Sequence, residues 1–172
     1  LSAVNLGALD SLDELEDITE IIVRSLDSLL DYQDYPLKSA EIASNNRRTL
    51  GIGVTNLAYY LAKNDAKYSD GSGNDLIHKT FEALQYYSLK ASNKLAEELG
   101  PCPLFSETQY AKGIMPIDSY KKDIDAFCST KLELDWDTLR RNIKSKGLRN
   151  STLTALMPCE SSSQISNSTN GI

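Results

Sequence analysis

The chain has 172 residues, with 24 acidic and 18 basic side chains and a formal net charge of −6. This length suits one domain with a sizeable core. The acidic balance argues against a nucleic-acid-binding surface, which needs clustered Lys and Arg. No apolar run approaches the roughly 20 residues that span a bilayer, and the first residues lack the basic and apolar regions of a signal peptide. We therefore expect no membrane contact and no direct nucleic-acid binding.

The first half of the chain predicts two strands separated by helices. Apolar residues recur at helical spacing from Leu12 to Leu30, and acidic residues fill the first turn, where the helix dipole favours them. A compact apolar run that includes two glycines follows Arg47-Arg48-Thr49. The expected elements are a strand over 1–6, helices over 12–30 and 37–44, a strand over 50–54 and a helix over 55–63.

Gly51 and Gly53 do not form a dinucleotide-binding fingerprint. The third glycine is absent, and no acidic residue follows at the distance that this motif requires. We interpret the two glycines as positions of close backbone packing in a crowded core.

The second half predicts one long helix, two shorter helices and a last strand. The long helix covers 75–99 and is ended by Gly100-Pro101. Irregular chain follows to Pro116, and the remaining predictions are helices over 119–128 and 135–146 and a buried strand over 153–156. Strands alternating with helices predict an α/β fold with a parallel sheet.

The cysteines and the histidine give no sign of a catalytic or metal site. Cys102, Cys128 and Cys159 are too widely spaced for a disulfide framework or a zinc motif, which favours a reducing cytoplasm. His78 is the only histidine, so no His-based metal site is expected, and we interpret it as a surface or capping residue. Tyr86-Tyr87 is interpreted as core packing.

The most informative segment is the hydroxyl-rich turn Cys159-Glu160-Ser161-Ser162-Ser163, which follows the last strand and Pro158. The first N–H groups of a helix lack internal partners and favour an anion, so a strand that runs into this turn could bind phosphate. Serine is also a common helix cap, and Glu160 counts slightly against an anion. From the residues alone, both a phosphate site and plain capping stay open.

Five short blocks of the sequence are informative together: Leu1-Ser2-Ala3-Val4-Asn5-Leu6-Gly7, Arg47 to Val54, Tyr110-Ala111-Lys112-Gly113-Ile114, Gly147-Leu148-Arg149-Asn150-Ser151, and Met157-Pro158 with Ser162-Ser163-Gln164-Ile165. With these blocks in this order, the chain resembles the large, catalytic subunit of aerobic class I ribonucleotide reductase, and it looks closest to the bacterial and phage class Ia type. The resemblance runs essentially from end to end. It implies that residues 1–172 form a helix-rich part of a ten-stranded α/β barrel, a partial catalytic domain incomplete at both ends.

The resemblance also implies a function, the thiyl-radical reduction of ribonucleoside diphosphates to deoxyribonucleoside diphosphates for DNA synthesis. In that family the turn after Met157-Pro158 binds the substrate phosphates. This role falls on Pro158, Cys159, Glu160, Ser161 and Ser162. Bacterial relatives usually have serine at Cys159 and threonine at Ser161. The first difference removes one hydroxyl, and the second keeps one.

None of the family's catalytic groups maps onto this chain, so we expect no catalytic residue and no bound cofactor within it. The resemblance implies that they lie elsewhere in a longer subunit. It also implies a radical from a metal-containing small subunit, ATP and dNTP effectors, and thioredoxin or glutaredoxin as reductant. The chain begins with Leu1 rather than Met, and we expect an internal segment. The alternative is a non-catalytic helical interaction domain whose serine-rich end is only a cap.

Overall fold

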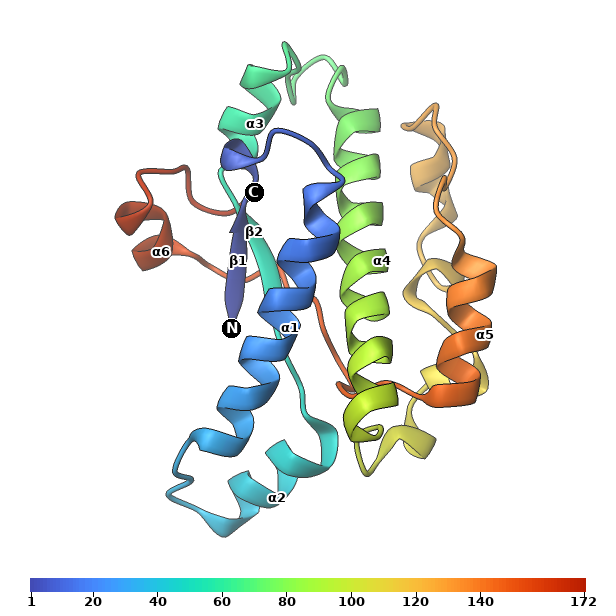
Figure 1. Cartoon of the computed structure of the whole chain (residues 1–172). Coiled ribbons are helices and arrows are strands. Elements are labelled where there is room, and N and C mark those ends of the chain that lie inside the picture. Colours follow the sequence, from blue (N-terminus) through green and yellow to red (C-terminus); the bar gives the residue numbers. More distant parts are fainter.

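The computed structural model describes residues 1–172 and has a small parallel sheet covered by helices (Figure 1). A core of 22 buried apolar residues joins the strands to the helices. It includes Val4, Ile52 and Val54 from the sheet, Leu15 and Val23 from the first helix, and Leu84 and Leu89 from the longest one. The sheet is open, because its strands do not close into a barrel within this chain. The parallel α/β arrangement predicted from the sequence is therefore confirmed.

Two strands form the regular part of the sheet. Strand β1 (Ser2–Asn5) pairs in parallel with β2 (Ile52–Thr55), with Ser2 opposite Ile52 and Asn5 opposite Thr55. All four residues of β2 are buried. The observed strand β1 is one residue shorter at each end than the predicted strand over 1–6. Leu1 is exposed, and Leu6 starts the 3-10 turn η1 (Leu6–Ala8).

The predicted third strand is reduced to a single parallel bridge, between Ile52 and Thr154. Three backbone hydrogen bonds hold this segment to the β2 side of the sheet: Leu50 N–H to Thr152 O, Ile52 N–H to Leu153 O, and Ala155 N–H to Ile52 O. Leu153 is buried, but Leu156 is 64% exposed, so the expected burial of the whole run 153–156 is wrong. Pro158 follows closely and has no N–H to extend the ladder, which favours an early end to the pairing.

The glycines of the β2 region serve close packing, as predicted. A Cβ on Gly53 would lie 2.5 Å from the carbonyl oxygen of Ala155 and 2.9 Å from Cε of Met157. A Cβ on Gly51 would lie 2.4 Å from Cδ2 of Leu1. The segment that leads to Pro158 can therefore approach β2 only because residue 53 has no side chain.

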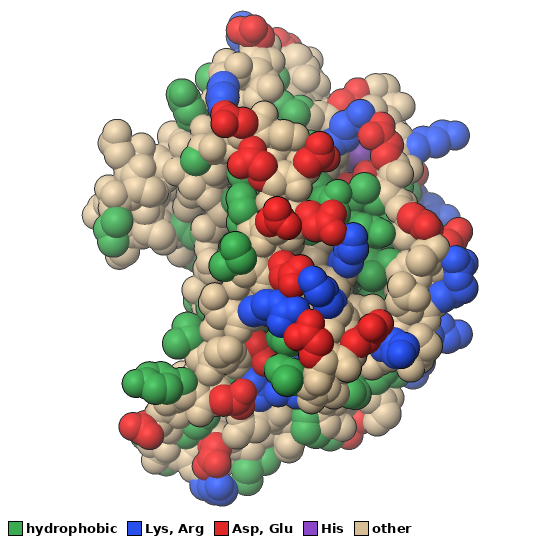
Figure 2. Space-filling model, viewed as in Figure 1, with side chains coloured by type: hydrophobic (Ala, Val, Ile, Leu, Met, Phe, Trp, Pro, Cys, Tyr) green, Lys and Arg blue, Asp and Glu red, His purple; other side chains and the backbone are tan.

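Two long helices, α1 (Glu14–Tyr32) and α4 (Asn74–Leu99), pack side by side, and both were predicted within two residues of their ends (Figure 1). Acidic side chains of α1 face basic ones of α4, as in the pairs Glu16–Lys90 at 2.6 Å and Glu20–Lys94 at 2.7 Å. Figure 2 shows this mixed band of red and blue side chains on the surface. Exposed pairs of this kind add little stability, so the buried apolar faces hold the two helices together.

Two short helices complete the first half of the chain. Helix α2 (Lys38–Arg47) is followed by its C-cap residue Arg48, which has a left-handed backbone with a φ of 47°. Helix α3 (Leu57–Lys63) follows β2, and its N-cap residue Asn56 is also left-handed, with a φ of 67°. The predicted helices over 37–44 and 55–63 are therefore confirmed, with small shifts at their ends.

The predicted helix over 119–128 is wrong. This region holds only the short 3-10 turn η5 (Lys122–Ala126). Three other 3-10 turns precede it: η2 (Phe105–Glu107), η3 (Tyr110–Lys112) and η4 (Pro116–Asp118). Ile124 and Phe127 are 50% and 69% exposed, so a helix here would have no apolar face to bury. The prediction over 135–146 is confirmed as α5 (Trp136–Lys146), with Asp135 as its N-cap.

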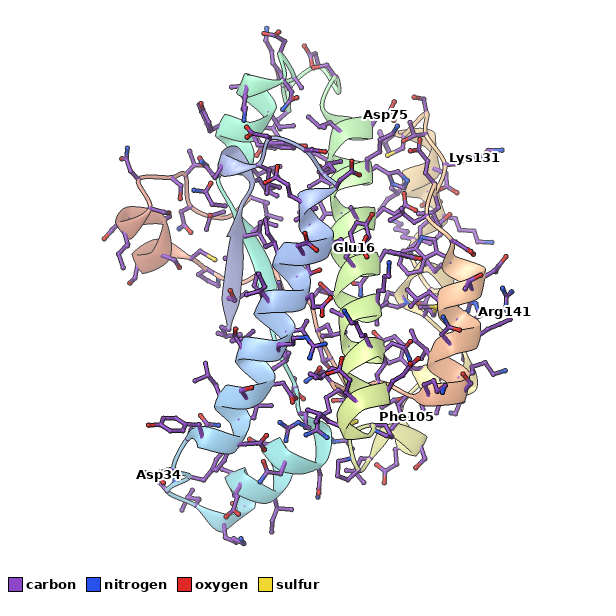
Figure 3. All side chains as sticks on the ribbon, in the orientation of Figure 1. Glu16, Asp34, Asp75, Phe105, Lys131 and Arg141 are labelled. Carbon is purple, nitrogen blue, oxygen red and sulfur yellow. The ribbon has the colours of Figure 1, made fainter.

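Carboxylates of α4 hold the irregular segment that leads into α5. Glu82 is buried and accepts hydrogen bonds from Glu133 N–H at 2.9 Å, Leu134 N–H at 3.0 Å and Trp136 Nε1 at 3.0 Å. Asp75, at the start of α4, accepts from the backbone N–H and the hydroxyl of Ser129 (Figure 3). These contacts satisfy backbone N–H groups in the irregular segment between η5 and α5.

Candidate functional site: the serine-rich turn

The serine-rich turn lies where the chain leaves the carboxyl end of the sheet. After its bond to Ile52 the chain passes Met157 and Pro158, and helix α6 (Glu160–Ile165) begins beyond Cys159. In Figure 1 this helix projects to the side of the sheet, away from α4 and α5. Such strand ends are where ligands gather in parallel α/β folds.

The first turn of α6 presents free hydrogen-bond donors. The backbone N–H groups of Glu160, Ser161 and Ser162 have no acceptor within the chain, as expected at a helix start. Ser161 and Ser162 are exposed, and their hydroxyls make no hydrogen bond. The turn can therefore offer three amides and two hydroxyls to one ligand.

Ser163 and Cys159 have structural contacts instead. Ser163 is buried, and its hydroxyl donates to the carbonyl of Glu160 at 2.8 Å. The Cys159 thiol is buried and donates to Met157 O at 3.3 Å, while its backbone N–H donates to Asn170 Oδ1 at 2.9 Å. The amide of Cys159 is therefore already used within the chain. Pro158 is exposed beside it.

Positive charge is absent from this part of the chain. No Lys or Arg occurs after Arg149, and Glu160 carries a negative charge. An anion bound here would depend on backbone amides, hydroxyls and the helix dipole, which together suit a phosphate.

Sequence reasoning missed the asparagines that surround the turn. Asn56, just after β2, donates from Nδ2 to Asn5 Oδ1 at 2.9 Å and accepts from Thr169 N–H at Oδ1, at 3.1 Å. Its own N–H donates to Thr169 O at 2.9 Å. The one available signal was that Asn5 ends β1 and Asn56 directly follows β2, since polar residues at strand ends often serve a site.

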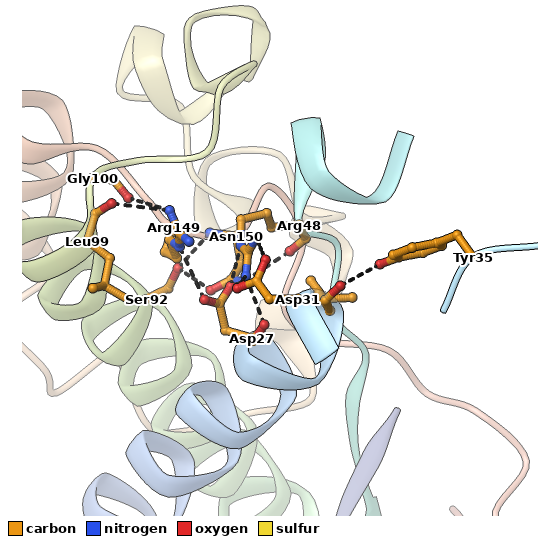
Figure 4. A network of polar contacts seen from close by, with 10 residues as sticks. Asp27, Asp31, Tyr35, Arg48, Ser92, Leu99, Gly100, Arg149 and Asn150 are labelled. Carbon is orange, nitrogen blue, oxygen red and sulfur yellow. Dashed lines mark hydrogen bonds and ion pairs between the residues drawn. The ribbon is translucent and has the colours of Figure 1, made fainter. Parts of the chain in front are cut away.

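A second polar cluster, the buried ionic network, was also missed (Figure 4). Asp27 Oδ1 accepts from Arg48 Nε at 2.7 Å and from Asn150 Nδ2 at 2.9 Å, and Asp27 Oδ2 accepts from Arg149 Nε at 3.1 Å. Asp31 binds Arg48 through both carboxylate oxygens at 2.8 Å, and this hydrogen bonding holds the pKa of Asp31 below its ordinary value. The network joins two of the blocks that carried the family resemblance, and its contacts are structural.

The other candidate residues lie away from the turn. Cys102 is buried, and burial raises the pKa of its thiol, which favours the unreactive protonated form. Tyr86 packs edge-on against Tyr87 and Trp136, with ring centroids 5.4 Å and 5.2 Å apart, which confirms a packing role. His78 borders a cavity of about 830 Å³ between α4 and the 116–132 segment, and no residue of the serine-rich turn lines that cavity.

The chain has neither a cluster of metal-ligating side chains nor a helix suited to crossing a membrane. No group of three or more His, Cys, Asp or Glu side chains is close enough together to hold a metal ion. None of the helices combines the length and the apolar character needed to cross a membrane.

The parallel strands, covering helices and strand-end turn define a piece of an α/β protein with a candidate anion site. A family model described as the ribonucleotide reductase barrel domain matches residues 1–172. The chain belongs to this family, as its resemblance predicted.

Similar proteins from bacteria and a phage agree with this assignment. The chain is 64% identical to the ribonucleoside-diphosphate reductase subunit alpha of Haemophilus influenzae over 172 residues, all of this chain and 23% of that protein. It is 66% identical to the ribonucleoside-diphosphate reductase 1 subunit alpha of Escherichia coli over 143 residues, 83% of this chain and 19% of that protein. It is 55% identical to the corresponding subunit of Enterobacteria phage T4 over 159 residues, 92% of this chain and 21% of that protein.

The chain thus spans less than a quarter of the length of these relatives. Family membership argues against the alternative of a non-catalytic helical interaction domain.

Proposed function

We propose that this chain is part of a ribonucleoside-diphosphate reductase large subunit, in which it supplies barrel scaffold and the turn that grips the substrate diphosphate. Phosphate binding is supported by one observation: hydrogen-bond donors on Glu160, Ser161 and Ser162 have no partner within the chain, and they lie at the end of a parallel strand segment. The names of the similar proteins, ribonucleoside-diphosphate reductase subunits, support ribonucleoside diphosphates as the substrate class.

In this proposal the three amides and the hydroxyls of Ser161 and Ser162 bind the phosphate oxygens. Cys159 shapes the turn, because its N–H is held by Asn170 and its thiol is buried. Pro158 ends the strand segment and directs the chain into the turn. Fixing the diphosphate at one strand end places the ribose over the interior of the barrel, where binding energy from the remote phosphates orients the reacting sugar.

The remaining parts of the reaction belong outside these residues. The reactive cysteines would come from other parts of the subunit, and the radical from a metal-containing small subunit. Thioredoxin or glutaredoxin would supply electrons, ATP and dNTPs would act as effectors, and the enzyme would work in the cytoplasm. In this proposal the chain contributes no metal ligand.

The test is the double substitution Ser161→Ala with Ser162→Ala in a full-length subunit. Both side chains are exposed and make no hydrogen bond, so the fold should survive. Loss of two hydroxyl donors should weaken ribonucleoside diphosphate binding about tenfold or more. Unchanged affinity, measured by equilibrium binding, would remove the site assignment.

A further inference from the structure

The loop that contains the serine-rich turn is closed on itself and fastened to the sheet by asparagines. Helix α6 ends at Ser166, and the chain turns back through Asn167, whose φ is 49°. Ser168 N–H donates to Ser163 O at 2.9 Å, and Cys159 N–H donates to Asn170 Oδ1 at 2.9 Å. The two ends of the loop over 159–170 are therefore joined.

Asn56 fastens this closed loop to the ends of both strands. Its N–H donates to Thr169 O, and its Oδ1 accepts from both the backbone N–H and the hydroxyl of Thr169. Its Nδ2 donates to Asn5 Oδ1, at the last position of β1. Asn56 is only 8% exposed. A continuous polar path thus runs from β1 through Asn56 to residues 169 and 170, and on to Cys159.

The side chain of Asn56 packs directly against Gly7. A Cβ on Gly7 would come within 2.3 Å of Asn56 Nδ2. Asn56 also has a left-handed backbone, which Asn tolerates better than most residues. Asparagine therefore suits position 56 in two ways: its side-chain amide makes the hydrogen bonds to Asn5 and Thr169, and its backbone tolerates the positive φ.

We infer that Asn56 and Asn170 are positioning residues that hold the serine-rich turn in the shape needed to receive a substrate diphosphate; this rests on the proposed function. Neither residue needs to touch the substrate. Asn170 takes up the Cys159 N–H and so directs the next three amides outward together. Asn56 fixes the returning chain, and with it the distance between the turn and the sheet.

The test compares variants in the complete reductase. Asn170→Ala removes the acceptor for Cys159 N–H, and Asn56→Gly removes the side-chain bonds but keeps a residue that accepts positive φ. Each should raise KM for the ribonucleoside diphosphate about five- to tenfold, with kcat within about twofold, because the turn binds the phosphates and not the reacting carbon. Inhibition by a nucleoside without phosphates should be unchanged.

A matched control is Asn142→Ala, an exposed asparagine on α5 whose side chain makes no hydrogen bond. It should leave KM and kcat as in the unmodified enzyme. If Asn170→Ala does not fold, Asn56→Gly decides the question by the same readouts.

The results distinguish the positioning role of Asn56 and Asn170 from phosphate binding by the serine-rich turn. If Ser161→Ala with Ser162→Ala raises KM but the asparagine variants do not, the positioning role is overturned and the grip stands. If the serine double variant also leaves KM unchanged, the grip itself fails. If the asparagine variants weaken nucleoside inhibition as much as diphosphate binding, their effect is general disruption and the positioning role is overturned.

Discussion

Asn150 donates a hydrogen bond from Nδ2 to Asp27 Oδ1 at 2.9 Å, although the two residues lie 123 positions apart in the chain. Both side chains are almost fully buried. The same amide nitrogen donates to Arg48 O at 3.0 Å, and the Asn150 backbone N–H donates to Ser92 Oγ at 3.0 Å. Asn150 therefore ties α1, α4 and the approach to β2 together just before the segment that leads to the serine-rich turn.

Asp27→Ala should be strongly destabilising. It leaves Arg48 and Arg149 without a buried carboxylate and removes an acceptor from Asn150. Loss of one partner from a buried ion pair typically costs about 3–5 kcal/mol. We expect a clear fall in the melting temperature of the full-length subunit. Asp137→Asn, an exposed change on α5, is the control, and equal melting of the two variants would contradict the role of the network.

Acid should weaken the contact between α1 and Arg48. Hydrogen bonding to Arg48 holds the pKa of the Asp31 carboxyl below its ordinary value. A carboxyl whose pKa is lowered on folding contributes stability that is fully present above its unfolded-state pKa and is lost as the pH falls through its folded-state pKa. Asp31 is 58% exposed, so solvent screening keeps the effect small. Asp31→Asn should flatten the melting temperature against pH below about pH 4, and an unchanged acid slope would contradict this assignment.

Glu82→Gln should loosen the segment over 129–136 without unfolding the sheet. The carboxylate accepts three N–H donors, whereas the amide of Gln brings donor hydrogens to the same place. The cost should be about 1–3 kcal/mol, confined to this segment. Hydrogen exchange followed by mass spectrometry should show faster exchange at Glu133 and Leu134 and unchanged protection of β2. Faster exchange in β2 as well would show that Glu82 supports the whole fold.

Gly53→Ala should disturb the approach to the serine-rich turn, whereas Gly51→Ala should be milder. The new methyl at residue 53 would meet the backbone oxygen of Ala155, which cannot move without breaking its pairing with β2. At residue 51 it would meet the end of the Leu1 side chain, which can rotate away. We expect Gly53→Ala to cost about 1–3 kcal/mol. Melting temperatures compare the two, and an equal or larger loss for Gly51→Ala would contradict this account.

The isolated chain over 1–172 should be poorly soluble. The parallel strands leave unpaired edges, and large apolar side chains such as Ile21, Leu29 and Tyr32 are exposed on α1. Open edges and exposed apolar patches favour aggregation. Size-exclusion chromatography of the purified chain should give aggregates, and a monodisperse product with a cooperative melt would contradict this prediction.

Periodicity and end signals in the sequence were enough for α1, α4 and α5, because an apolar stripe and a clear stop depend on nearby residues. The helix predicted over 119–128 is absent because Ile124 and Phe127 find no apolar surface to pack against, which the local spacing of apolar residues does not reveal. The serine-rich turn could be located from its own residues. The contacts of Asn56 with Asn5 and Thr169, and that of Asn150 with Asp27, join residues about 50 to 120 positions apart, which no local pattern reveals.

The most direct measurement is an experimental structure of the full-length subunit with a ribonucleoside diphosphate bound. The account predicts phosphate oxygens about 2.7–3.2 Å from the backbone nitrogens of Glu160, Ser161 and Ser162, with Cys159 N–H still bonded to Asn170. A diphosphate bound elsewhere, or one that takes the Cys159 N–H away from Asn170, would contradict it.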